Sequence, residues 1–140
     1  MTATIGSLPE GVKRVECPET PLPFDLKHAL IRAAATSNGM EICGFITSRM
    51  SPYFLMNHSP KPEANYECDL GETRRAIELI AAGNDRVIGF FHSHPSGVTY
   101  PGQQDVAGWP NPDLNWRYFI VTATGVYEYE LTADDECVSE

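Results

Sequence analysis

The chain has 140 residues, a length that suits a single domain with its own hydrophobic core. It carries 10 basic and 19 acidic residues, a formal charge of −9, which argues against a nucleic-acid-binding surface because such a surface needs clustered Lys and Arg. The 42% hydrophobic and 10% aromatic content excludes wholesale disorder. No run of about 18 apolar residues predicts a membrane helix, and residues 1–11 lack the features of a secretory signal. We therefore expect a cytoplasmic protein.

Residues 1–22 are rich in proline and show no period, which predicts an extended arm that straps the core or docks a partner. Residues 23–132 are predicted to form the domain, and residues 133–140 an acidic, frayed tail. The hydrophobic spacing predicts a helix over 24–38 that Asn38 and Gly39 end. Further along, it predicts short strands over 41–48, 52–57 and 65–68, a helix over 69–82, a strand over 86–94, a short helix over 102–109, and a hairpin over 116–122 and 126–131. Helices and strands mix without strict alternation, which predicts an α+β fold with a mixed sheet.

The cysteines show no metal-binding pattern. There is no CxxC pair and no repeated spacing among the four, Cys17, Cys43, Cys68 and Cys137, so a zinc ribbon is excluded. Two disulfides are possible by count, but without a secretory signal we expect reduced thiols. Cys43 and Cys68 are expected to be buried.

The predicted strand 86–94 contains a His-x-His pair. Alternate residues of a strand share a face, which places His92 and His94 together with Ile88 and Phe90. Both imidazoles could therefore reach one metal ion. Zinc accepts nitrogen and carboxylate ligands, and its catalytic sites usually offer three protein ligands and a water. Asp105, at the expected start of a helix, is the candidate third ligand.

A water activated by zinc needs a base, and Glu41 is the candidate because a charged residue that opens an apolar strand needs a reason. Each residue also has an ordinary interpretation. A His-x-His pair is often exposed or hydrogen-bonded, Asp105 could be a helix cap, and Glu41 could be a charge at a strand end. His58, in a loop, could form part of the rim of the same cleft.

Three runs of this sequence together resemble the JAMM (MPN-plus) metalloprotease motif: EICGFI at 41–46, IGFFHSHP at 88–95 and PGQQD at 101–105. That motif is a glutamate upstream of His-x-His, then seven residues of which the first is a proline, a serine, two residues and an aspartate. Asn57 with residues 66–69 looks similar to the JAMM domain of phage tail-assembly proteins and their small bacterial relatives. The resemblance implies a cytidine-deaminase-like JAMM domain, with Zn²⁺ held by His92, His94 and Asp105 and with Glu41 as the base.

The resemblance also implies hydrolysis of amide bonds in a protein or peptide substrate, often isopeptide bonds or the tails of ubiquitin-like proteins. One position departs from the motif, because Gly102 stands where the family has a serine that helps to stabilise the tetrahedral intermediate. Losing one such donor costs on the order of 10²–10³ in rate. As a helix cap, glycine is tolerated at this position. A substitute donor could come from Ser96, Thr99, Gln103 or a backbone N–H.

Three functions are therefore open. The first is a JAMM-type zinc metallopeptidase, or isopeptidase. The second is a catalytically weak or inactive binding module of the same fold, such as a phage tail component, which would place it in a virion. The third is nucleic-acid work, suggested by the run HPSG at 94–97, which some bacterial radiation-response proteins share; the charge of −9 argues against it. The sequence does not predict an oligomeric state.

Overall fold

The computed structural model describes residues 8–102, 105 and 115–131. Several predictions fall outside this part of the chain: the start of the arm, most of the short helix 102–109, the tail 133–140, and the residues Gln103 and Cys137. Within the described residues the elements are β1 (Val12–Val15), α1 (Phe24–Ala35), β2 (Cys43–Thr47), β3 (Pro52–Leu55), α2 (Leu70–Ala82), β4 (Val87–Ser93), β5 (Arg117–Val121) and β6 (Val126–Leu131). Neither described helix is long and apolar enough to cross a membrane.

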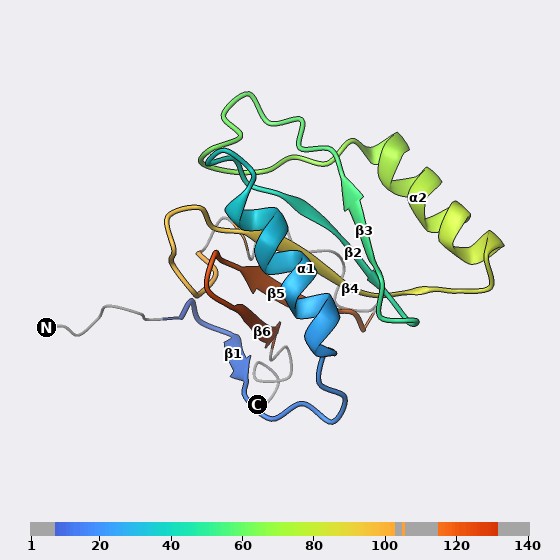
Figure 1. Ribbon diagram of the computed structural model, residues 1–140, viewed down its shortest axis with the longest axis horizontal. Helices are drawn as coiled ribbons and strands as arrows, with labels where there is room; N and C mark the ends of the chain where they lie inside the picture. The colour runs from blue at the N-terminus through green and yellow to red at the C-terminus, as the bar shows by residue number, and fades with distance from the viewer. Residues whose placement is uncertain (1–7, 103–104, 106–114, 132–140) are drawn as a thin grey trace, which may run out of the picture.

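The strands form one mixed sheet in the order β1-β6-β5-β4-β2-β3 (Figure 1). Strands β4 and β5 run parallel, and the other neighbouring pairs are antiparallel. Parallel neighbouring strands need a crossover connection rather than a tight hairpin. The predicted α+β fold, a mixed sheet with helices beside it, is confirmed.

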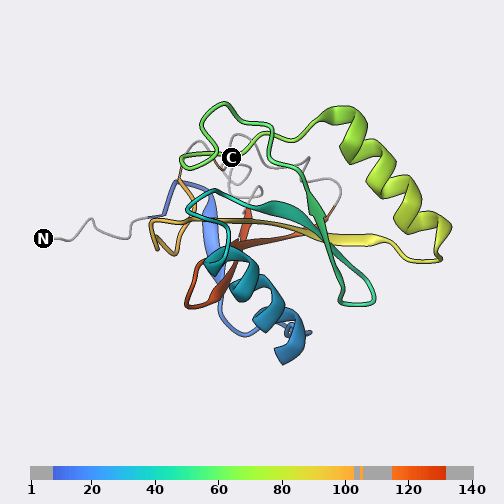
Figure 2. The ribbon, with the colours of Figure 1, turned by 45° about the horizontal axis from the view of Figure 1, so that its top comes forward.

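The two helices lie on opposite sides of the sheet (Figure 2). Each side has its own apolar cluster, because alternate residues of each strand point to opposite faces. The cluster under α1 contains Leu22, Leu26, Leu30, Ile46, Phe91, Phe119 and Val121. The cluster on the α2 side contains Cys43, Phe45, Leu55, Ala76, Ile80, Phe90, Tyr118, Ile120 and Tyr129.

Strand β4 follows the predicted alternation in its second half only. Phe90 packs in the α2-side cluster and Phe91 in the cluster under α1, as the period of two requires. Ile88 was expected to share a face with Phe90, but it packs under α1, while Val87 packs on the α2 side. The register between β2 and β4 shifts at this point. Such an irregularity adds one residue to the strand, so the residues before it point to the opposite face of the sheet.

The helix ends follow local chemistry. The carboxylate of Asp69 accepts a 2.8 Å hydrogen bond from the Glu72 N–H and caps α2, as predicted. Helix α1 stops three residues before the predicted end, at Ala35, because Asn38 and Gly39 both adopt positive φ and turn the chain.

Two short segments differ from the prediction. Residues 12–15, inside the predicted arm, form β1 along the edge of β6. Residues 65–68 do not form a strand; the Asn57 side chain satisfies this segment instead, donating to the Asn65 carbonyl and accepting from the Glu67 N–H. An amide that mimics a backbone turn competes with strand pairing.

Candidate metal centre

Three predicted ligands converge at the end of β4. His92 is the sixth residue of β4 and His94 follows the strand, while Asp105 comes from the segment after it. The Nε2 of His94 lies 3.0 Å from Asp105 Oδ2, and the Nε2 of His92 lies 3.7 Å from Asp105 Oδ1. One ligand atom from each of these residues lies within 4.8 Å of the others. The structure therefore brings together the residues that the spacing suggested.

The burial of His92 tests whether a metal ion fits here. Its side chain is 1% exposed, and neither ring nitrogen has a hydrogen-bond partner in the described structure. A buried polar group without a partner costs about 1–3 kcal/mol, so native proteins rarely tolerate one without a reason. Two imidazoles and a carboxylate form the nitrogen and oxygen donor set that zinc accepts. The residues present fit such an ion.

The ring of His94 is oriented by the backbone carbonyl of Val98. Its Nδ1 donates a 3.0 Å hydrogen bond to the Val98 carbonyl, which leaves Nε2 facing Asp105. A hydrogen bond of this kind from the second ring nitrogen commonly fixes metal-binding histidines. Burial lowers the pKa of His94, but the hydrogen bond and the charge of Asp105, with smaller contributions from Val98 and Glu41, together outweigh burial, so the net pKa is raised.

Asp105 is held from two sides. It accepts a 2.8 Å hydrogen bond from the Gly102 N–H in addition to its contact with His94. Burial raises the pKa of Asp105, but the hydrogen bond to His94 and the nearby His92 outweigh it, so the net pKa is below the usual value. The carboxylate is thus kept ionised, the state in which it can bind a cation.

Glu41 lies just before β2, and the structure places it beside His92. Its side chain is 7% exposed, and its Oε1 lies 3.8 Å from His92 Nδ1 without a hydrogen-bond partner among the described residues. The backbone at this point is fixed, because the Glu41 carbonyl accepts a 2.9 Å hydrogen bond from Asn57 Nδ2. Ser93 Oγ accepts a 2.8 Å hydrogen bond from the Ile42 N–H, which ties the neighbour of Glu41 to the residue between the two histidines.

An open cleft of about 540 Å³ leads to this group. Its lining residues are Glu41, Ala64, His94, Ser96, Val98, Tyr100, Gly102 and Asp105. The carboxylate of Glu41 and two of the three grouped residues therefore face one opening. A cleft of this volume lies within the range of ligand-binding sites.

The remaining predicted residues are spread around the cleft. Ser96 and Gly102 line it, whereas Thr99 is absent from the lining and its carbonyl accepts a hydrogen bond from the Tyr129 hydroxyl. His58 is also absent from the lining; its Nε2 lies 3.3 Å from Glu72 Oε1. Among the described residues, apart from its chain neighbours, the nearest atom to a Cβ built on Gly102 is Asp105 Oδ2, at 3.8 Å, an ordinary van der Waals distance.

Tyr66 is a residue that the sequence did not single out for the site. Its ring packs against the His92 ring with centroids 4.5 Å apart, and its buried hydroxyl has no partner in the described structure. Burial, followed by the charge of Asp105, raises the pKa of Tyr66, so the phenol stays protonated. No spacing rule connects Tyr66 with a histidine 26 positions away, and only the fold reveals the contact.

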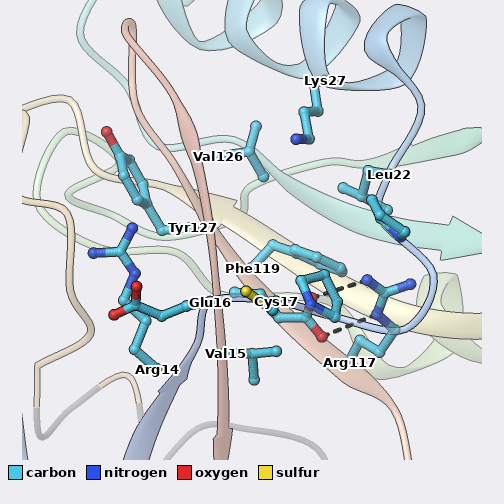
Figure 3. A pocket seen from close by; sticks show the side chains of 13 residues that line it. Arg14, Val15, Glu16, Cys17, Leu22, Lys27, Arg117, Phe119, Val126 and Tyr127 are labelled. Carbon is cyan, nitrogen blue, oxygen red and sulfur yellow. Dashed lines mark hydrogen bonds and ion pairs between the residues drawn. The ribbon is translucent and has the colours of Figure 1, made fainter.

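A second cavity, of about 420 Å³, lies beside α1 and contains none of the predicted site residues (Figure 3). Charged groups in this second cavity contact one another or an aromatic ring. Arg117 donates two hydrogen bonds of 2.9 Å to the Glu128 carboxylate, and the Arg14 guanidinium lies 5.1 Å from the centroid of the Tyr127 ring. Lys27 extends from α1 toward the same space (Figure 3).

A mixed sheet thus lies between two helices, and a His–His–Asp group stands at the end of a central strand with a glutamate beside it. The family model of prokaryotic homologues of the JAB domain matches residues 23–133. The chain belongs to this family, which confirms the resemblance to JAMM proteins.

Two curated relatives are similar over most of their length. A desampylase of Pyrococcus furiosus is 26% identical over 123 residues, covering 85% of each chain. A desampylase of Haloferax volcanii is 29% identical over 119 residues, covering 79% of this chain and 82% of the relative. The solution structure of a Desulfitobacterium hafniense protein matches with a TM-score of 0.55 and 22% identity over 74% of this chain and 84% of that one, which shows a shared fold. The similarity to phage tail-assembly proteins stays a prediction.

Proposed function

We propose that this protein is a JAMM-type zinc hydrolase that cleaves amide bonds in a protein substrate. The observation that carries the proposal is the His92 side chain, 1% exposed with two unpartnered nitrogens, within reach of His94 and Asp105. A cation bound between His92, His94 and Asp105 would give the Nε2 of His92 a partner.

The chain's own residues supply the other parts of the reaction. When bound, zinc supplies a Lewis acid for the scissile carbonyl and lowers the pKa of water. Glu41, which faces the cleft with an unpartnered Oε1, accepts the proton of the attacking water and passes it to the leaving amine. The Val98 carbonyl orients His94, and the Gly102 N–H holds Asp105.

The substrate class is proposed from the relatives and the cleft together. The two relatives named desampylases favour a ubiquitin-like protein conjugate, with the isopeptide or C-terminal amide bond as the site of cleavage. The cleft is open and half of its lining residues, Glu41, His94, Ser96 and Asp105, are polar or charged, which suits an extended, polar tail better than an apolar small molecule. We propose the cytoplasm as the place of action.

The missing serine hydroxyl supports the second candidate, a metal-binding module with little or no turnover. The backbone N–H of Gly102 already donates to Asp105, so it is committed and does not replace that hydroxyl. Of the hydroxyl-bearing residues predicted as substitutes, Ser96 lines the cleft. Ser96, together with Tyr100, is therefore the local source of a donor if the protein turns over substrate.

The test compares the zinc-loaded protein with the Glu41→Gln variant on a ubiquitin-like protein carrying a C-terminal extension. We expect zinc content to stay the same and cleavage to fall on the order of 10²–10⁴-fold, because the base is lost while the ligands remain. Glu78→Gln, an exposed glutamate on α2, is the matched control and should cleave like the wild type. Equal rates for Glu41→Gln and wild type would remove Glu41 from the mechanism, and stoichiometric zinc without any cleavage would favour the binding module.

A further inference from the structure

Two thiols lie in contact next to the metal centre. The Sγ atoms of Cys43 and Cys68 are 3.7 Å apart, although the residues are 25 positions apart in sequence. Cys43 is fully buried in β2, whereas Cys68 is partly exposed. The proposed hydrolysis uses neither thiol, so their juxtaposition needs a separate explanation.

The two thiols differ in the way that redox-sensitive pairs differ. The hydrogen bond from Cys43 lowers the pKa of the Cys68 thiol, against the opposing effect of burial. The same hydrogen bond, together with burial, raises the pKa of Cys43. The partly exposed thiol with the lowered pKa is the better nucleophile, and a buried thiol beside it can resolve the oxidised product.

The pair also joins the two segments that enclose His92. Cys43 is the register partner of His92 across β2 and β4. Tyr66, two residues before Cys68, packs its ring on the His92 ring at 4.5 Å. A movement of Cys68 toward Cys43 would therefore change what covers His92.

A disulfide would require such a movement. The sulfurs now lie 3.7 Å apart, and a disulfide bond needs about 2.05 Å. Strand β2 is paired on both sides, with β3 and β4, so Cys43 is held in place. Residues 65–68 are held by the Asn57 amide and by one backbone hydrogen bond, from the His58 N–H to the Glu67 carbonyl, and not by a strand ladder, so this segment yields more easily than β2.

We propose that Cys43 and Cys68 are a modification site at which a hydroperoxide forms a reversible disulfide, and that this bond shifts Tyr66 on His92 and lowers hydrolysis. The Cys68 thiolate attacks the peroxide; an S–O bond forms, the O–O bond breaks, and hydroxide or an alkoxide leaves with a proton as water or alcohol. The Cys43 thiol then attacks the sulfenic sulfur; the S–S bond forms, the S–O bond breaks, and water leaves. Two thiols lose two electrons, the peroxide gains them, and a thiol reductant reverses the change.

The disulfide itself is tested without reference to activity. The zinc-loaded full chain is treated with hydrogen peroxide, remaining thiols are alkylated, and peptides are mapped by mass spectrometry. We expect a cross-linked peptide joining Cys43 and Cys68, lighter by two hydrogen atoms, in the wild type and in the Cys17→Ser control. Cys43→Ser should instead stop at a sulfenic acid on Cys68. Survival of both thiols, or a disulfide formed elsewhere in preference, would overturn the proposal.

The effect on the centre rests on the proposed function and has two readouts. We expect kcat/KM on the extended ubiquitin-like substrate to fall about tenfold or more on oxidation and to recover with dithiothreitol, because small displacements in a site are costly. We also expect the His92 imidazole resonances to shift between the reduced and oxidised forms. A disulfide that leaves both readouts unchanged would refute the regulatory part. Shifted resonances in a protein that never cleaves substrate would uphold the modification and refute the proposed hydrolysis.

Discussion

The two cavities differ in how their polar groups are satisfied. Beside α1, the Arg117 guanidinium and the Glu128 carboxylate meet through two hydrogen bonds of 2.9 Å. At the end of β4, the ring of His92 and the Oε1 of Glu41 are buried without partners among the described residues. The sizes are similar, about 420 and 540 Å³. Charged residues in a cavity therefore do not by themselves indicate a metal-binding or catalytic site. Buried polar atoms that lack a partner are the stronger indication of such a site.

The largest effect that this comparison predicts is that of His92→Leu. We expect this variant to lose zinc and hydrolysis, because one of three ligands is gone. In the absence of metal it should nevertheless be more stable than wild type by about 1 kcal/mol, since two unpartnered buried nitrogens disappear. Chemical denaturation of metal-free and zinc-loaded proteins measures both effects. A metal-free variant that is clearly less stable than wild type would show that His92 is a packing residue.

Arg117→Leu probes the other cavity and should give the opposite pattern. Zinc binding should be unchanged, while the free energy of unfolding falls by about 1–3 kcal/mol, because Glu128, whose side chain is 13% exposed, loses its partner. Urea titration and metal analysis of the same sample measure the two quantities. Adding Glu128→Leu should recover part of the loss. Reduced zinc binding in the single variant would contradict the separation of the two regions.

The smallest effect is expected for Gly102→Ser, which tests the departure from the family motif. The nearest atom to an added Cβ is 3.8 Å away, and φ does not lie in the left-handed region, so the fold should be kept with a stability change of a few tenths of a kcal/mol. Hydrolysis should stay the same or rise. Thermal unfolding and kcat/KM check both expectations. A large loss of activity would mean that the site is built around glycine.

Features that depend on local chemistry could be predicted from the sequence. The carboxylate cap of α2, the hairpin strand β6 and the shared face of Phe90 and His92 all follow from neighbours in sequence. The period of two in a strand also explains why His92 and His94 both reach Asp105. These are patterns that a few adjacent residues determine.

Features that depend on partners distant in sequence could not be predicted from the sequence. Strand β1 has partly buried residues only at its two ends, with two exposed residues between them, so it shows no alternation; it exists because the edge of β6 is there to pair with it. The change of face at Ile88 comes from a register shift against β2. The ring of Tyr66 reaches His92 because the Asn57 amide holds Asn65 and Glu67, the residues on either side of Tyr66. Hydrophobic spacing does not encode this contact.

Strand β1 has a practical consequence for producing the domain. The family match begins at residue 23, yet residues 12–15 complete the sheet and the buried Leu22 covers the core under α1. A fragment trimmed to the match would leave the outer edge of β6 with free N–H and C=O groups. Open edges of this kind recruit strands from other molecules and promote aggregation. The domain of this chain is therefore best expressed with about a dozen residues before the family match, enough to include the edge strand.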